Sequence, residues 1–279
     1  EKERPLPDTQ ATEQAILALK ALTNRSNPWF LGIGLHKPHL PFLAPQALVA
    51  LYPLPNSTAT QTASVVQLPS NPYAPVDMPA VAWTPFGEIR AQYKDIHALN
   101  LSGGYNTTGS DRMPDAVTLA LRQHYYAAVS YVDEHVGALL GKLRDEGLYA
   151  SSIVVVHADH GYQLGEHGIW EKKSNFDLAV RVPLLIKVPG KPHAAGSRTA
   201  SLTDLVDVFP TLAALAGLAA PSAVDGDDVS KLFDAPSTPL KDAAFHQYPA
   251  CLMESLNQTR GGCNNVPKDQ FDFMGYSVR

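Results

Sequence analysis

The feature that most constrains the fold is an apolar run at residues 153–156, Ile-Val-Val-Val, which leads into Asp159-His160-Gly161. A short run rich in β-branched residues and bounded by polar residues and glycine predicts a buried strand. In open α/β sheets, ligands bind at the edge formed by the carboxyl ends of the strands. The sequence therefore predicts an α/β sheet that presents a carboxylate and an imidazole, two possible metal ligands, at that edge.

Helical periodicity is visible in several other parts of the chain. Apolar residues that recur every three or four positions predict helices over residues 12–24, 114–146 and 204–217. Asp8 or Thr9 is a possible cap of the first helix, and Gly147 ends the second. Pro210 is expected to interrupt the third helix. The helix over 114–146 has the strongest pattern.

Apolar runs between these helices predict strands at residues 29–34, 153–156, 183–188 and 243–248. Residues 53–112 are rich in Pro, Ser, Thr, Asn and Gly and predict a long loop excursion, with one helical turn near 87–93. Helices and strands that alternate in this way indicate an α/β fold with a mainly parallel, doubly wound sheet.

The composition limits the classes of partner. The 279 residues are 45% hydrophobic and 18% charged, which is enough for one large domain or two small ones. The net charge of -5 and the lack of a Lys/Arg-rich block argue against a nucleic acid partner. The apolar runs are too short for a membrane span.

Cysteine and asparagine patterns indicate the compartment. Five Asn-x-Ser/Thr triplets favour a lysosomal or secreted glycoprotein, and they begin at Asn24, Asn56, Asn100, Asn106 and Asn257. In such a compartment Cys251 and Cys263 are candidates for a local disulfide. Because neither cysteine belongs to a C-x-x-C pair, a zinc site is not expected.

Both ends of the sequence read as cut. The chain opens on Glu1-Lys2-Glu3-Arg4, which lacks the apolar core of a signal peptide. It stops at residues 274–279, which read as the opening of a strand. We therefore expect this sequence to be part of a longer chain.

Asp159 and His160 are the leading candidates for metal ligands. A carboxylate at the end of a strand suits a hard cation, and Gly161 lets the backbone turn without blocking the site. Calcium prefers oxygen donors, so an imidazole ligand implies a secondary contact or a metal that tolerates nitrogen. The alternative is that Asp159 caps a turn and His160 is a solvated loop residue.

Lys172 and Lys173 follow Trp170 in a segment whose aromatic residues predict a packed loop. A lysine held in such a loop would neutralise an oxyanion beside the metal. The spacing does not decide which of the two lysines points inward, and both also fit ordinary surface positions.

His36 and His39 flank Lys37-Pro38, and the proline biases this segment towards an extended conformation. A histidine at the end of a strand can protonate a leaving alkoxide at mildly acidic pH. Hydrogen-bonded structural histidines are the alternative. Glu166 and His167 either hold the metal ligands in place or are polar loop groups.

Several common catalytic motifs do not occur. The sequence has no G-x-S-x-G elbow, no P-loop, no dinucleotide fingerprint and no H-E-x-x-H motif. The acidic residues 225–228 lack EF-hand spacing and read as a turn. A metal-and-lysine site for a small oxyanion therefore remains the leading hypothesis.

Taken together, these segments resemble the sulfatases of the alkaline-phosphatase-like superfamily. The match lies in WFLGIGLHKPHLPF (29–42), YYAAVSYVDEHVGALL (125–140) and DHGYQLGEHGIWEKKSNFD (159–177), with further agreement in RVPLLIKVPG, DLVDVFPTLAALAGL and MGYSVR. The resemblance implies that residues 1–240 form part of the sulfatase α/β domain and that residues 241–279 open a truncated C-terminal subdomain. The fold would then be incomplete at both ends.

The resemblance also assigns roles to the candidate residues. Asp159 and His160 correspond to two ligands of the family's divalent cation, which is usually calcium. Lys172 corresponds to the lysine that contacts the sulfate, and His36 to the histidine near the sulfate and the leaving oxygen. The other candidates would lie around the sulfated carbohydrate substrate: Lys37, His39, Glu166, His167, Trp170 and Lys173.

The sequence departs from the family pattern in the nucleophile. Sulfatases carry an Asp-Asp pair and a C-x-P/A-x-R motif upstream, and the cysteine of that motif becomes the nucleophilic formylglycine. Neither Cys251 nor Cys263 fits this motif, so formylglycine is expected in a preceding segment. Tyr162 stands where a tryptophan is expected, which alters the expected pocket. The alternatives are a related phosphatase or phosphodiesterase with a Ser or Thr nucleophile, and a catalytically inactive fragment.

Overall fold

A computed structural model describes residues 5–23, 25–55, 65–79, 82–83, 87–99, 101, 112–250, 263, 266–271 and 273–279. The chain forms two compact units. The first unit contains Glu1–Tyr149, Tyr162–Ser174 and Pro249–Phe273, and the second contains Ala150–Gly161, Asn175–Tyr248 and Met274–Arg279. The domain boundary predicted after residue 240 stays a prediction.

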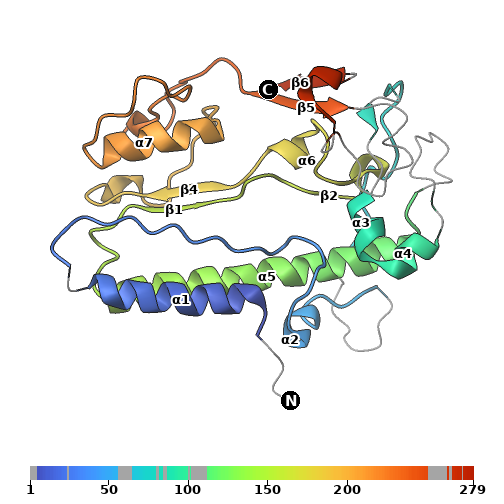
Figure 1. The fold of residues 1–279 in the computed structure, drawn as a ribbon, viewed down its shortest axis with the longest axis horizontal. Helices are drawn as coiled ribbons and strands as arrows, with labels where there is room; N and C mark the ends of the chain where they lie inside the picture. Colours follow the sequence, from blue (N-terminus) through green and yellow to red (C-terminus); the bar gives the residue numbers. More distant parts are fainter. Residues whose placement is uncertain are drawn as a thin grey trace. The chain divides into compact units, whose positions relative to one another are not determined.

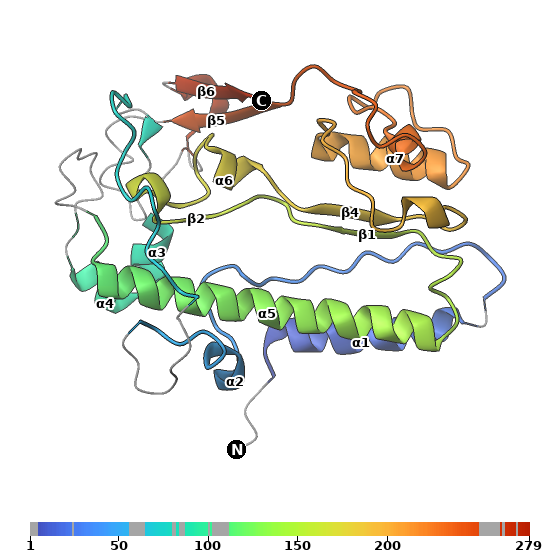
Figure 2. The same ribbon diagram turned by 180° about the vertical axis from the view of Figure 1, so that it is seen from behind.

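The first unit is built on the helix α5, Asp115–Asp145, which confirms the strongest helix prediction. Gly147 follows it with φ of 70°, a left-handed conformation that favours glycine and ends the helix. Helix α1, Pro7–Leu22, lies alongside α5 in both views (Figures 1 and 2). Helix α2, Gln46–Val49, packs on α5 as well.

The first unit contains several further short elements and an apolar core. Two short helices, α3 (Gly87–Gln92) and α4 (Lys94–Ala98), lie in the predicted loop excursion. Strands β2 (Gln163–Leu164) and β3 (Trp170–Glu171) pair antiparallel, with the 3-10 turn η2 (Glu166–Gly168) between them. A further 3-10 turn, η6, spans Lys268–Gln270. The core residues are Leu40, Phe42, Ile89, Ile96, Met113, Leu121, Leu164 and Trp170.

The second unit contains strand β1, Val154–His157, paired with β4, Leu184–Lys187. The short helix α6, Asp177–Val180, lies between these strands in the sequence. Helix α7, Val208–Leu215, follows later in the chain. The 3-10 turns are η3 (Pro192–Ala194), η4 (Leu205–Asp207) and η5 (Ser230–Phe233), and the last sheet pairs β5 (Phe245–Ala250) with β6 (Phe273–Val278).

The α/β class agrees with the structure, but the predicted parallel pairing is wrong for the pair β1 and β4, which is antiparallel. A parallel pair needs a long crossover, usually a helix that packs on the sheet. The connection from β1 to β4 contains only the single-turn helix α6 and the β2–β3 hairpin. The parallel pattern expected from the alternation along the sequence therefore does not hold for this pair.

The predicted buried strand at residues 29–34 is also wrong. This segment has no assigned secondary structure and pairs with no described strand, and Phe30 is 88% exposed. A strand is stabilised by its ladder and by side-chain contacts across it, so apolar character alone does not produce one.

Pro210 does not interrupt a helix as predicted. It lies in the first turn of α7, where a missing N–H costs no intrahelical hydrogen bond.

None of the described helices is long and apolar enough to cross a membrane.

Candidate active site

The loop that carries the two candidate histidines is anchored by a carboxylate from helix α1. Asp8, only 3% exposed, accepts the backbone N–H of His36 at 2.7 Å and that of Lys37 at 2.8 Å. The sequence suggested Asp8 as a cap of its own helix. The structure instead uses it to fix a loop about thirty residues further along the chain.

Replacing Asp8 by alanine is expected to lower the free energy of unfolding by about 2 kcal/mol, because the buried N–H of Lys37 and the part-buried N–H of His36 lose their acceptor. Urea denaturation of the natural protein that carries this chain measures this loss. Asp8→Asn keeps one carbonyl oxygen, so its free energy of unfolding is expected to lie between those of the wild type and Asp8→Ala. An Asp8→Ala variant as stable as the wild type would contradict the anchoring role.

Lys37 lies within the same loop and is used to hold its shape. Its ammonium donates to the carbonyl oxygens of His39 at 3.0 Å and Pro41 at 2.7 Å. Burial lowers the pKa of Lys37, although Asp8 opposes the shift. The ammonium is therefore directed at the backbone of its own loop.

His39 connects this loop to the lysine segment. Its Nδ1 lies 2.8 Å from the carbonyl oxygen of Leu40, which can only accept, so Nδ1 carries the proton. Its Nε2 then accepts from the ammonium of Lys172 at 3.4 Å. The ring of His36 lies 4.7 Å from that of His39, measured between centroids. The structure thus brings His36, His39 and Lys172 together.

Glu88, at the start of α3, pairs with both lysines. One carboxylate oxygen lies 3.2 Å from Lys172 Nζ and the other 3.2 Å from Lys173 Nζ. Burial alone would raise the pKa of Glu88, but the ammonium groups of Lys173 and Lys172 outweigh it and hold that pKa below its usual value. Sequence reasoning missed Glu88, because it lies in the predicted loop excursion and belongs to no recognisable motif.

Glu171, which precedes the lysines on β3, is a second residue that the sequence did not reveal. Its side chain is fully buried, and one oxygen accepts the N–H of Ile89 at 3.0 Å. Burial raises the pKa of Glu171 to about 7. Burial also raises the pKa of the neighbouring Tyr162 well above its ordinary value, and the charge of Glu171 adds to this shift.

Three other predicted site residues support the β2–β3 hairpin. Glu166 accepts from Arg122 at 2.8 Å and from the N–H of Leu164 at 2.6 Å. His167 Nδ1 lies 3.2 Å from the side-chain oxygen of Gln163, and burial lowers the pKa of His167. Trp170 is a core residue.

Asp159 and His160 follow β1 in the second unit, as predicted. His160 Nδ1 lies 2.8 Å from the carbonyl oxygen of Gly161, and its Nε2 lies 3.5 Å from Asp159 Oδ2. The Asp159 side chain is 84% exposed, and its Oδ1 accepts the N–H of His160 at 2.9 Å. The two side chains thus offer one oxygen and one nitrogen donor.

The turn after these residues is held against helix α6. The N–H of Gly161 donates to the carbonyl oxygen of Ala179 at 2.8 Å. A Cβ on Gly161 would lie 2.0 Å from the carbonyl oxygen of Leu178, so only glycine fits here. This close approach fixes the backbone immediately after the two candidate ligands.

The donor chemistry of Asp159 and His160 fits part of a cation site. Calcium takes about six to eight oxygen ligands, so two side chains cannot complete its coordination shell. Among the described residues, no group of three or more His, Cys, Asp or Glu side chains is arranged to hold a metal. Asp159 and His160 would therefore supply two ligands of a cation, and other groups would have to supply the rest.

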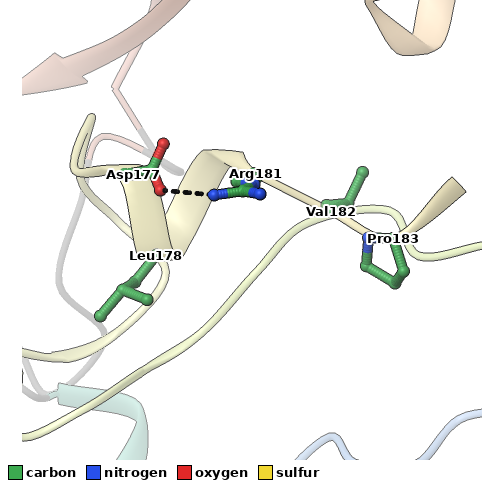
Figure 3. Close-up of a pocket in the computed structure, with 5 residues that line it drawn as sticks. All are labelled: Asp177, Leu178, Arg181, Val182 and Pro183. Atoms are coloured by element: carbon green, nitrogen blue, oxygen red, sulfur yellow. Dashed lines mark ion pairs between the residues drawn. The ribbon is translucent and has the colours of Figure 1, made fainter. Parts of the chain in front are cut away.

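The second unit also contains a pocket of about 390 Å³ beside α6, shown in Figure 3. Its lining includes the ion pair of Arg181 with Asp177, 3.8 Å apart. The remaining lining residues are Leu178, Val182 and Pro183. None of the predicted site residues lines it, so we assign it no role in catalysis.

Comparison with known proteins places these residues in a family. The model of the sulfatase family matches residues 4–218. Iduronate 2-sulfatase of Mus musculus is 40% identical over 321 residues, which cover 99% of this chain and 54% of the mouse protein. The Homo sapiens protein of the same name is 36% identical over 99% of this chain and 55% of its own length.

Solved structures show the same fold. The phosphonate monoester hydrolase of Silicibacter pomeroyi matches with a TM-score of 0.65 and 24% identity, over 98% of this chain and 50% of that protein. A protein in complex with its substrate D-glucosamine-2-N,6-O-disulfate matches with a TM-score of 0.67 and 19% identity, over 99% and 63%. The chain spans about half the length of the curated relatives that it matches. It belongs to the sulfatase family.

Proposed function

We propose that the protein carrying this chain hydrolyses sulfate esters of a sulfated carbohydrate, as the name iduronate 2-sulfatase states for its relatives. The observation that carries the proposal is the cluster of Lys172 with His39 and His36, found in a chain that is 40% identical to such an enzyme. A fixed ammonium beside two imidazoles suits an anionic ester and its leaving group.

Each residue of the cluster has a distinct role in this proposal. Lys172 binds a sulfate oxygen and offsets the negative charge that grows there in the transition state. His36 lies beside His39, and the described residues form no hydrogen bond to its ring. It is therefore available to donate a proton to the leaving alkoxide. His39 orients the ammonium of Lys172 by accepting from it. Lys173 balances the charge of Glu88 next to the substrate.

Asp159 and His160 are proposed as two ligands of a divalent cation, which we expect to be calcium. A divalent cation supplies positive charge to an anionic oxygen that it binds. The nucleophile is expected to be formylglycine from a segment outside this sequence.

A lysosomal or secreted location is proposed for the protein. Cys263 is buried and disulfide-bonded, which suits an oxidising compartment. Its predicted partner Cys251, and the asparagines of the five Asn-x-Ser/Thr triplets, lie outside the described residues.

The test compares a sulfate ester with the matching phosphate and phosphonate esters, using the natural protein that carries this chain. The sulfate ester is expected to be hydrolysed fastest. Treatment with a chelator is expected to reduce that rate by about tenfold or more, and added Ca²⁺ to restore it. Preferential hydrolysis of the phosphate or phosphonate ester would refute the proposed reaction.

A further inference from the structure

Glu88 is a single carboxylate shared by two adjacent lysines. Each of its oxygens faces a different ammonium, Lys172 Nζ at 3.2 Å and Lys173 Nζ at 3.2 Å. The side chains are 23% exposed for Glu88, 18% for Lys172 and 6% for Lys173. Partly buried pairs of this kind are screened less by solvent than surface pairs. Glu88 therefore restricts the positions that the Lys172 ammonium can take.

The backbone beside Glu88 is also held in place. The buried carboxylate of Glu171 accepts the N–H of Ile89, the residue that follows Glu88 in the first turn of α3. Glu171 also directly precedes Lys172, and its φ of 75° turns the chain at this point. The two segments therefore hold each other. Glu171 binds the backbone beside Glu88, and Glu88 binds the side chains that follow Glu171.

The net charge of Glu88, Lys172 and Lys173 favours an anionic ligand. Two ammonium groups face one Glu88 carboxylate, so these three side chains carry one net positive charge. Lys172 also reaches His39 Nε2 at 3.4 Å, at the edge of the histidine cluster. Lys173, the more buried of the two lysines, lies on the other oxygen of Glu88. Lys172 is thus the ammonium that is directed at the candidate site.

We propose that Glu88 is the positioning residue of Lys172, holding its ammonium beside His39 where it meets an oxygen of the sulfate ester. The role rests on the function proposed above for this site. Glu88 touches no substrate atom. Glu88 acts by fixing the direction of the Lys172 side chain. The ammonium of Lys173 pairs with the second carboxylate oxygen of Glu88.

A positioning role and a purely electrostatic role of Glu88 predict opposite effects on catalysis when its carboxylate is neutralised. If Glu88 acted only through its charge, Glu88→Gln would favour the bound anion, because a negative charge beside the lysines is removed. If Glu88 positions Lys172, the same substitution frees the ammonium and weakens catalysis. A misplacement of about 1 Å can cost roughly 100-fold in rate.

The experiment uses the natural protein that carries this chain and a small sulfate ester. Glu88→Gln is expected to lower kcat/KM by about 10- to 100-fold and to weaken inhibition by inorganic sulfate. Glu88→Asp keeps the carboxylate and is expected to recover part of the loss. Glu146→Gln is the matched control, since Glu146 pairs with Lys142 on α5, away from the site, and its kcat/KM is expected to match the wild type.

A second measurement does not depend on turnover. The acetylation rate of the Lys172 amine, followed by peptide mass spectrometry, is expected to rise in Glu88→Gln and to remain at the wild-type value in Glu146→Gln. Unchanged acetylation of Lys172 in a folded Glu88→Gln variant would overturn the proposal, as would an unchanged or raised kcat/KM in Glu88→Gln. A wild-type protein that hydrolyses no sulfate ester would refute the proposed function, whereas acetylation would still decide whether Glu88 positions Lys172.

Discussion

Replacing Lys172 by methionine is expected to lower kcat/KM for sulfate-ester hydrolysis by about 100- to 1000-fold, in the range found when one oxyanion-stabilising group is removed. Methionine keeps most of the side-chain length and removes the charge. The ammonium of Lys172 is the one that reaches the histidine cluster, so its loss leaves the growing negative charge on the sulfate oxygens less stabilised.

Two variants sharpen this prediction. Lys173→Met is expected to have a smaller effect, because Lys173 is more buried and pairs with the other oxygen of Glu88. Lys20→Met, on the exposed part of α1, controls for the loss of a positive charge and is expected to leave kcat/KM unchanged. Steady-state kinetics of the three variants test the assignment. A larger loss in Lys173→Met than in Lys172→Met would reverse the roles of the two lysines.

Glu171→Gln is expected to remove a pH dependence of stability worth about 3 kcal/mol. Burial raises the pKa of Glu171 from 4.5 to about 7 in the folded protein. Between these values the folded protein retains a proton that the unfolded chain has lost, so rising pH favours unfolding. The favourable contribution is complete below about pH 4.5 and is lost as the pH rises through about 7.

The groups around Glu171 explain the direction of this shift. Burial is the largest cause, and the N–H of Ile89 opposes it by donating to the carboxylate. Glu88 raises the pKa of Glu171 further, and Lys173 lowers it. Tyr162 faces the same buried region, and the second oxygen of Glu171 has no hydrogen-bond partner among the described residues. A protonated carboxyl suits this environment better than a carboxylate.

The measurement is the free energy of unfolding in urea at pH 5 and at pH 8. Wild type is expected to lose stability relative to Glu171→Gln over this interval, because glutamine cannot ionise. Glu13→Gln, at an exposed position on α1, is expected to follow the wild type. If wild type and Glu171→Gln show parallel pH profiles, Glu171 is not protonated in the folded protein at pH 5.

Local patterns in the sequence determined several parts of this protein. Helical periodicity and Gly147 predicted α5, and the apolar run before Asp159-His160-Gly161 predicted β1 and the turn after it. Residue motifs gave the family, which the sulfatase model confirms. They also gave His36 and Lys172 as catalytic candidates, and these roles remain predictions. Such features could be predicted because each depends on residues that are close together in the chain.

The tertiary structure decided which of these candidates meet and what holds them. Glu88 pairs with lysines 84 and 85 positions away, and Asp8 binds a loop 28 and 29 positions away. The pKa of Glu171 depends on burial that packing creates. The antiparallel pairing of β1 with β4 and the exposure of Phe30 likewise depend on neighbouring segments. No periodicity or motif records these relations, because an ion pair, a buried proton or a strand ladder is set by groups that only folding brings together.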